Sequence, residues 1–439
     1  MKFFDRKSEI AELRDIRRKS RKSARFTVVV GRRRVGKTAL LKKAFEDGPY
    51  LYFYVSRKSE IELCEEYAEI LERSLGVRMH GRVQRFSEVF RTILEESEMR
   101  PITLVIDEFQ DFRRINSAIF GEMAREWDEF HMKAKINLVV CGSMNRMMSQ
   151  IFMDEGEPLY GRNTGKMEIR PFTVATLKEI LSVYSPKFGP DDLLALWAFT
   201  GGVGRYVALL MDEGAVTPKR MMSVMIRDGS SFIDEGKVVL VQEFGKDYGV
   251  YFTILSSIAR GKTTRAEIEA MIGGSASGYI SKLEDAYGLI EKVQPIFETK
   301  SNKGCAYRIR DNFFRFWFRF VYKYNYLVEL QLYDDLRKIV ERDYAVFSGL
   351  ALEGYFKAKF TEAGAYTRMG AWWDRRGENE IDLVCENEFK NRLEFFEVKR
   401  DGAHYDESAL IRKTEAFFAK NPAKRSLKTA WRGLSLGDM

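Results

Sequence analysis

Cysteine and histidine, the residues that build disulfide frameworks, zinc sites and histidine-based active sites, are scarce in this sequence. Its 439 residues include four cysteines, which lie far apart without paired spacing, and three histidines. Isolated cysteines argue against a disulfide framework and against a zinc site, and they fit a reducing compartment. Three histidines leave little room for histidine-based catalysis. We therefore expect an intracellular protein.

Long apolar runs are also missing. A membrane-spanning helix needs roughly 18 uninterrupted apolar residues, whereas the most apolar stretch, residues 313–322, is broken by Arg315 and Arg319. The N-terminus becomes polar at once, which is not typical of a signal peptide. With 45% hydrophobic and 31% charged residues the composition is that of a globular protein, and the length predicts two to four domains. We expect a cytoplasmic protein that does not cross a membrane.

The chain is mildly basic, with a net charge of +8. This charge permits binding to a polyanion but does not demonstrate it. The densest basic segment lies early, between Arg14 and Arg25. Two interpretations of this segment remain open: a solvated helix face beside the neighbouring domain, or a patch for nucleic acid.

A phosphate-binding loop follows the first apolar segment. Residues 26–30 are a short β-branched run, which predicts a buried parallel strand, and residues 39–45 have a helical pattern. The loop between them satisfies G-x-x-x-x-G-K-[ST], so both the string and its strand–loop–helix context are present. Glycines in such a loop let backbone N–H groups surround the phosphates. The predicted nucleotide-binding residues here are Gly31, Arg32, Arg33, Arg34, Val35, Gly36, Lys37, Thr38 and Ala39.

Two acidic residues follow a second buried-strand pattern at residues 102–106. Lys37 is expected to reach the β- and γ-phosphates, and the Thr38 hydroxyl to bind magnesium. Asp107 fits the carboxylate that holds magnesium through water, and Glu108 fits the base that orients the attacking water. These residues predict an ATP site with bound Mg²⁺ and catalytic roles for Lys37 and Glu108.

A third strand pattern, at residues 136–141, ends next to a polar residue. Ser143 is our candidate for a side chain that senses the γ-phosphate, with Asn145 second. A serine at a strand end is also a common turn residue, so both interpretations remain open.

Several segments together resemble the archaeal-type ATPases, which are AAA-like and STAND-like P-loop enzymes with an extra strand between their two nucleotide motifs. The resemblance is carried by the phosphate loop at 31–38, the acidic strand at 104–110, the strand at 139–143, and residues 4–13, 158–162, 169–172 and 200–205. It covers nearly the whole chain and implies an ATPase. Gly204 is a departure, because family members often have proline there.

The same resemblance implies that Arg162 or Arg205 reports on the γ-phosphate. An ordinary salt-bridge or surface role is the alternative for each arginine. Whether such an arginine acts in its own chain or on a neighbour in a homo-oligomer stays open.

The middle of the chain predicts two further regions. Residues 173–240 have apolar residues at helical spacing and predict helices. The resemblance implies that these helices form a lid over the nucleotide. Residues 241–310 predict a winged helix, with three helices before a β-hairpin. Its elements are expected at 251–258, from the capping box Thr264–Glu267, at 275–287 closed by Gly288, at 289–293 and at 306–309. The third helix has no arginine, so DNA binding and internal packing both remain open.

Residues 307–318 resemble a C-terminal signature of the same family. On an α-helix Arg315, Arg319 and Lys323 recur every four residues and would share one face. Packing in a core or an interface is the interpretation we prefer for the aromatic residues between them.

The C-terminal region predicts a second site. If the turn between two strand patterns centres on Phe389–Lys390, antiparallel pairing places Asp382 opposite Glu397, and alternation places Lys399 on the same face. Paired carboxylates can hold magnesium, and a lysine can help to align water. This pattern resembles the PD-(D/E)xK nuclease fold, with glutamate–isoleucine–aspartate in place of the usual proline–aspartate.

Three further residues accompany this pattern. Glu353, on a predicted helix, resembles the acidic residue of the first helix of that fold, so the predicted metal ligands of the tail are Glu353, Asp382 and Glu397. Glu380 is a lesser candidate, and Lys413 is a candidate for facing a phosphate.

Together these patterns predict an α/β protein. Its regions are a P-loop NTPase parallel sheet at 1–172, a helical lid at 173–240, a winged helix at 241–310 and a PD-(D/E)xK nuclease-like domain at 311–439. We expect ATP hydrolysis to be coupled to a tail that binds or cleaves nucleic acid. The alternatives are a nucleotide-gated signalling switch with an inactive tail and a winged-helix DNA-binding regulator.

Overall fold

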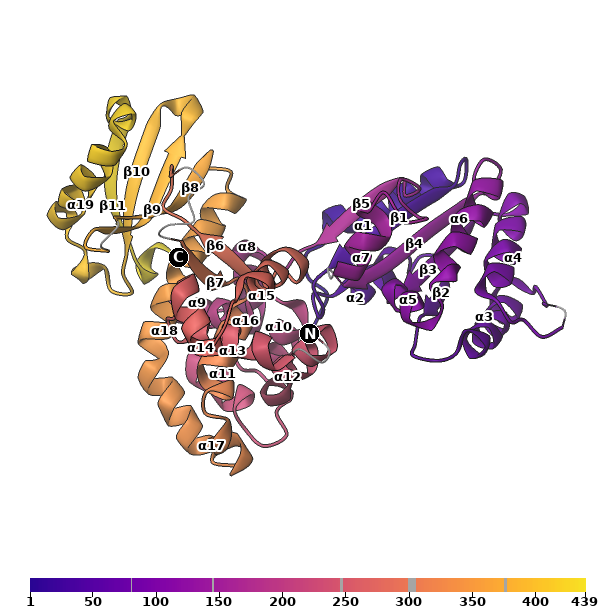
Figure 1. The fold of residues 1–439 in the computed structure, drawn as a ribbon, viewed down its shortest axis with the longest axis horizontal. Coiled ribbons are helices and arrows are strands. Elements are labelled where there is room, and N and C mark those ends of the chain that lie inside the picture. The colour runs from indigo at the N-terminus through magenta and orange to yellow at the C-terminus, as the bar shows by residue number, and fades with distance from the viewer. Residues whose placement is uncertain (80, 144–145, 245–247, 299–304, 375–376) are drawn as a thin grey trace. The chain divides into compact units, whose positions relative to one another are not determined.

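Five apolar segments form one parallel sheet in the computed structural model, which describes residues 1–79, 81–143, 146–244, 248–298, 305–374 and 377–439 (Figure 1). The strands are β1 (Arg25–Gly31), β2 (Leu51–Tyr54), β3 (Ile102–Asp107), β4 (Ile136–Ser143) and β5 (Gly165–Ile169). Their order is β2-β3-β4-β1-β5, and every neighbouring pair is parallel. Strand β4 therefore lies between the phosphate-loop strand and the acidic strand, as the resemblance implies.

Helices cover both faces of this sheet and complete the unit formed by Asp5–Pro171. They are α1 (Lys7–Ser20), α2 (Lys37–Ala44), α3 (Glu60–Leu75), α4 (Phe86–Met99), α5 (Phe112–Ile115), α6 (Ala118–Phe130) and α7 (Arg146–Met153). Alternate residues of β1 enter different cores: Val29 packs with Leu13 and Leu41, whereas Val28 packs with residues of α3, α4 and α6. Burial on both faces explains why the strands read as continuous apolar runs.

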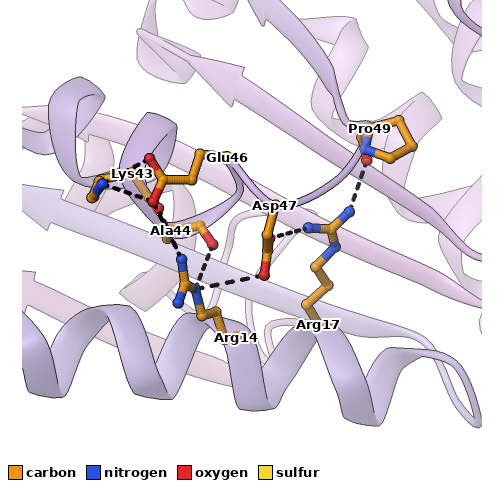
Figure 2. A network of polar contacts seen from close by, with 7 residues as sticks. All are labelled: Arg14, Arg17, Lys43, Ala44, Glu46, Asp47 and Pro49. Atoms are coloured by element: carbon orange, nitrogen blue, oxygen red, sulfur yellow. Dashed lines mark hydrogen bonds and ion pairs between the residues drawn. The ribbon is translucent and has the colours of Figure 1, made fainter.

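The basic N-terminal helix α1 is attached to the end of α2 by its arginines (Figure 2). Arg14 Nε donates to the Ala44 carbonyl at 3.1 Å, and Arg17 donates to Asp47 at 3.1 Å and to the Pro49 carbonyl at 2.9 Å. Cations suit the carbonyl end of a helix because they offset its partial negative charge. Arg14 and Arg17 therefore bind α2 and the segment that follows it, as expected of a helix face beside the neighbouring domain.

The second unit contains Phe172–Met439 together with Met1–Phe4. Its helices before the hairpin are α8 (Val174–Tyr184), α9 (Pro190–Thr200), α10 (Gly204–Asp212), α11 (Pro218–Met225), α12 (Ser231–Phe244), α13 (Tyr248–Ala259), α14 (Arg265–Ile272) and α15 (Ser277–Ser281). A π-helical segment, Lys282–Ala286, continues α15, and Gly288 follows with a φ of 61°. The antiparallel strands β6 (Ile290–Val293) and β7 (Ala306–Ile309) come next, in the order of elements that the sequence predicts.

A π-helical segment also interrupts the expected regular helix after the hairpin. Helix α16 (Asn312–Phe316) passes into the π-helix Trp317–Tyr322, followed by α17 (Asn325–Glu329) and the long α18 (Tyr333–Glu362). The predicted regular α-helix through Arg315, Arg319 and Lys323 is thus replaced by a π-helix over Trp317–Tyr322, which has a wider turn, yet Arg315 and Arg319 still line one cavity. Four of the six π-helical side chains are buried, more than one α-helical face would bury.

The C-terminal region forms a four-stranded sheet with strand order β11-β10-β9-β8 (Figure 1). Its strands are β8 (Arg368–Trp373), β9 (Glu380–Asn387), β10 (Arg392–Val398) and β11 (Lys428–Leu434), and α19 (Glu407–Lys420) packs on one face. Strands β8, β9 and β10 are antiparallel, whereas β11 is parallel to β10. The β9–β10 pair has the register predicted for a turn centred on Phe389–Lys390, since Phe396 pairs with Leu383.

Among the described residues, no helix combines the length and the apolar composition needed to cross a membrane.

Replacing Gly202 with alanine should destabilise the second unit. Gly202 has a φ of 74°, and an added Cβ would lie 2.3 Å from the Phe172 carbonyl oxygen. We expect Gly202→Ala to lower the free energy of unfolding by about 2–4 kcal/mol, because backbone strain and a steric clash add. Gly214 is the matched control: its φ is 61° but no atom lies within 4 Å of an added Cβ. Urea unfolding followed by circular dichroism measures both variants, and equal losses would contradict the prediction.

Candidate functional site

The phosphate loop joins β1 to α2 and holds Lys37 inside it. Gly36 has a φ of 105°, a conformation that favours glycine, and an added Cβ on Gly31 would lie 2.6 Å from the Ile169 carbonyl oxygen. The side chain of Lys37 is buried, and its Nζ donates to the carbonyls of Gly31 at 2.8 Å and Arg32 at 3.2 Å. These contacts place the ammonium at the loop where the predicted phosphates would bind.

Asp107 lies at the carboxyl end of β3 and collects three donors. Thr38 Oγ1 and the Tyr52 hydroxyl each donate to Asp107 Oδ2 at 2.7 Å, and the Glu108 backbone N–H donates to Oδ1 at 2.9 Å. A hydroxyl and a carboxylate at this separation are the hard oxygen ligands that Mg²⁺ prefers, so the donor set fits the metal. The predicted pair Thr38 and Asp107 is therefore brought together.

Tyr52 is a partner that the sequence did not indicate. It lies on β2, and its contact with Asp107 arises because β2 pairs in parallel with β3. Burial and the charge of Asp107 raise the pKa of Tyr52 above its usual range, so the hydroxyl stays a donor. Only the strand order, which is a tertiary feature, reveals this residue.

Glu108 is oriented by a second residue that sequence reasoning missed. Its backbone is left-handed, with a φ of 55°, and its carboxylate accepts a hydrogen bond from Gln110 Nε2 at 2.5 Å. Gln110 is 4% exposed, so its amide is held in place by packing. The sequence D-E-F-Q contains Gln110, but only the short helix Phe109–Asp111 turns it back towards Glu108.

The remaining residues predicted to contact the nucleotide lie in different parts of the chain. Ser143 is buried at the end of β4 and pairs in register with Gly31, next to the loop. Asn145 lies outside the described residues. Arg162 donates to both Asp128 oxygens, at 2.9 and 2.6 Å, and this pairing raises its pKa. Arg205 is exposed in the first turn of α10, in the second unit.

The predicted tail residues gather around the β9–β10 pair. Glu397 Oε1 accepts from Lys399 Nζ at 3.0 Å and from Lys413 Nζ at 3.2 Å. Its other oxygen, Oε2, is buried and has no hydrogen-bond partner within the part of the chain that the structure describes. Asp382 Oδ2 accepts from the Val398 backbone N–H at 2.8 Å. Asp382, Glu397 and Lys399 therefore lie close together at one end of the β9–β10 pair. Lys413 of α19 also contacts Glu397.

The electrostatics of these groups are coupled. Burial, together with the charge of Asp382, raises the pKa of Glu353 to about 7. Burial also raises the pKa of Asp382, whereas for Glu397 the lysine hydrogen bonds outweigh burial and lower the pKa. The pKa of Lys399 is raised by its hydrogen bond to Glu397 and by Asp382 and Glu353, against the effect of burial. Lys399 therefore interacts electrostatically with all three carboxylates.

Carboxylate oxygens are the groups of the tail site that could bind a metal. Among the described residues, no three histidine, cysteine or acidic side chains lie close enough to form a metal-binding group. The structure does not group Glu353, Asp382 and Glu397 as three metal ligands, so their joint binding of a metal stays a prediction. Glu397 Oε2, a buried carboxylate oxygen without a partner, is of the ligand type that Mg²⁺ takes. Glu380 is exposed at the start of β9.

Two family models match separate parts of the chain. Residues 3–210 match a family described as an ATPase domain predominantly from Archaea, and residues 317–411 match archaeal and bacterial proteins of unknown function. An uncharacterized protein of Methanocaldococcus jannaschii is 26% identical over 406 residues, covering 90% of this chain and 87% of that protein.

Two solved archaeal structures are similar to this chain. A Walker-type ATPase of Pyrococcus abyssi has a TM-score of 0.54 at 18% identity, covering 72% of this chain and 96% of its own. The ORC2 protein of Aeropyrum pernix has a TM-score of 0.48 at 12% identity, covering 77% and 95%. The first of these likenesses supports a P-loop ATPase fold.

Proposed function

Residues 3–210 of this chain belong to the archaeal-type ATPases, and from this premise we propose that ATP hydrolysis controls a metal-dependent, nuclease-like C-terminal domain. The proposal of a nuclease-like C-terminal domain is supported by the surroundings of Glu397. Two lysines bind one of its oxygens, and the other oxygen is buried without a partner among the described residues. The two lysines lower the pKa of Glu397 against the effect of burial, which keeps the carboxylate ionised.

The proposed ATP chemistry uses the residues at the carboxyl ends of β1, β3 and β4. Lys37 binds the β- and γ-phosphates, and Thr38 with Asp107 holds Mg²⁺, which neutralises charge on the phosphates. Glu108 orients the attacking water while Gln110 fixes its carboxylate. The additional arginine that such sites use is assigned to Arg162 or Arg205, either within the chain or between copies in a homo-oligomer.

The proposed tail chemistry divides the work between carboxylates and lysines. Glu353, Asp382 and Glu397 would hold Mg²⁺, which supplies an activated water and stabilises charge on a phosphodiester. The ammonium of Lys399 lies 3.0 Å from Glu397, so it can hold a water next to that carboxylate. Lys413 fixes the orientation of Glu397 rather than reaching a phosphate.

We also propose boundaries for four domains. We assign 1–172 to the ATPase core, 173–240 to the helical lid, 241–310 to a winged helix and 311–439 to the nuclease-like domain. The order of α13, α14, α15 and the β6–β7 hairpin supports the winged helix. The four-stranded sheet with α19 on one face supports a nuclease-like tail.

A nucleotide-gated switch with an inactive tail is the second candidate. It is favoured by the lack, among the described residues, of three closely grouped metal-binding side chains. In that case the tail binds its partner without cleaving it.

The test is cleavage of plasmid, linear and single-stranded DNA with Mg²⁺ or Mn²⁺, with and without ATP. We expect the wild type to cleave at least one substrate, the double variant Asp382→Ala/Lys399→Ala to lose cleavage, and Lys37→Ala to change its dependence on ATP. Cleavage by the wild type that never exceeds that of the double variant would leave the inactive-tail switch as the function.

A further inference from the structure

A cavity of about 390 Å³ lies within the second unit, beside the proposed tail site. The β6–β7 hairpin, the α16–π-helix segment, α18 and β8 form its walls. A volume of this size is in the range that holds a small ligand or one nucleotide.

Three arginines line this cavity: Arg308 from β7, Arg315 from α16 and Arg319 from the π-helix. Arg308 is 3.7 Å from Glu353, and Arg315 donates to the Asn312 side-chain oxygen at 3.4 Å. The guanidinium of Arg319 lies 5.7 Å from the centre of the Phe320 ring and makes no ion pair with the described residues. Burial, with the neighbouring charge of Arg308, lowers the pKa of Arg315 to about 10. Positive charge is thus concentrated here beyond what the lining carboxylates, Glu353 and Glu380, neutralise.

Aromatic side chains stand beside these arginines. Tyr307 and Trp373 line the same cavity from β7 and β8, and both side chains are half-buried. Positive charge combined with aromatic faces is the surface on which proteins hold single-stranded nucleic acid, because the cations bind phosphates and the rings stack on bases.

The cavity continues towards the proposed cleavage site. A second cavity of about 190 Å³ shares Arg308, Glu353, Val293 and Ala371 with the first one. Its own lining adds the lysines Lys292 and Lys357 and the carboxylates Glu291 and Asp382. The two cavities therefore adjoin each other at Arg308 and Glu353, with Arg319 lining the first and Asp382 the second, and we call them together the groove.

We propose that this groove holds a single nucleic-acid strand and leads it to Asp382, an inference that rests on the proposed nuclease-like function. Phosphates are held by Arg308, Arg315 and Arg319, and a base stacks on Tyr307 or Trp373. A single strand fits better than a duplex, because a duplex about 20 Å wide cannot enter walls that enclose one nucleotide.

The test is fluorescence anisotropy of a labelled 20-nucleotide single strand in EDTA, measured over a series of salt concentrations with the full chain. Arg308→Ala and Arg319→Ala are compared with Arg425→Ala, an exposed arginine after α19 that pairs with Glu415 and does not line the groove. We expect each groove variant to weaken binding about tenfold and to reduce the slope of log K against log salt by about 0.7, the value per phosphate contact for single strands. Arg425→Ala should match the wild type, and Arg319→Lys should keep the slope.

Slopes and affinities that do not differ between the groove variants and Arg425→Ala would overturn the proposal. So would displacement of the strand from Lys37→Ala protein by equimolar ATP or ADP, since the groove would then take a free nucleotide. Binding that depends on the arginines without cleavage of any DNA substrate keeps the groove and removes the nuclease activity. Cleavage that does not depend on the arginines keeps the nuclease activity and removes the groove as the binding site.

Discussion

Glu108→Gln should lower the rate of ATP hydrolysis by about 10²–10⁴-fold, the usual contribution of a general base, while ATP binding stays close to that of the wild type. Glutamine keeps the shape of the side chain but cannot accept the proton of the attacking water. The phosphate contacts from Lys37 and the loop are unchanged, so the loss should fall on kcat rather than on KM. Steady-state phosphate release and equilibrium binding of a labelled ATP analogue measure the two quantities.

Two further variants make this result specific. Lys37→Ala should reduce ATP binding and hydrolysis together, because it removes a charge that contacts both ground state and transition state. Glu95→Gln, an exposed residue of α4, should behave as the wild type. Hydrolysis by Glu108→Gln at the wild-type rate would assign the role of the base to a different residue.

Glu397→Gln should lower metal-dependent DNA cleavage by about 10²–10³-fold, since it replaces a charged ligand and leaves Lys399 and Lys413 without their common carboxylate. The substitution preserves volume in a buried position, so folding should be affected less than activity. Initial cleavage rates at several Mg²⁺ concentrations, with circular dichroism to check the fold, measure the effect.

Glu388→Gln is the matched control for this variant. Glu388 is exposed in the turn of the same hairpin, away from both lysines, and its variant should cleave DNA as fast as the wild type. If Glu397→Gln cleaves as well as Glu388→Gln, Glu397 is not a metal ligand.

The two sites differ in how much of them the sequence reveals. In the nucleotide site, Gly31–Thr38 are contiguous, so a local strand–loop–helix pattern predicts their geometry. The parallel arrangement then follows, since buried strands of this kind end at one edge of a sheet. For the tail, period-two alternation and the position of one turn were enough to predict the register that pairs Phe396 with Leu383.

Other contacts lay beyond sequence reasoning because they join segments that have no fixed separation along the chain. Tyr52 reaches Asp107 only through the pairing of β2 with β3, and Lys413 reaches Glu397 only because α19 packs on the sheet. The π-helix at Trp317–Tyr322 was missed for a different reason: its aromatic residues fit an ordinary helix pattern, and only packing on several sides favours the wider turn.

The sequence alone therefore determined the phosphate loop, the acidic strand and the hairpin with Asp382 and Glu397, because each depends on neighbours within one or two elements. The tertiary structure alone decided which distant side chains complete these sites and brought Arg308, Arg315 and Arg319 around one groove. The physical reason is that local patterns encode backbone conformation and burial, whereas the meeting of charged groups from separate elements depends on how those elements pack.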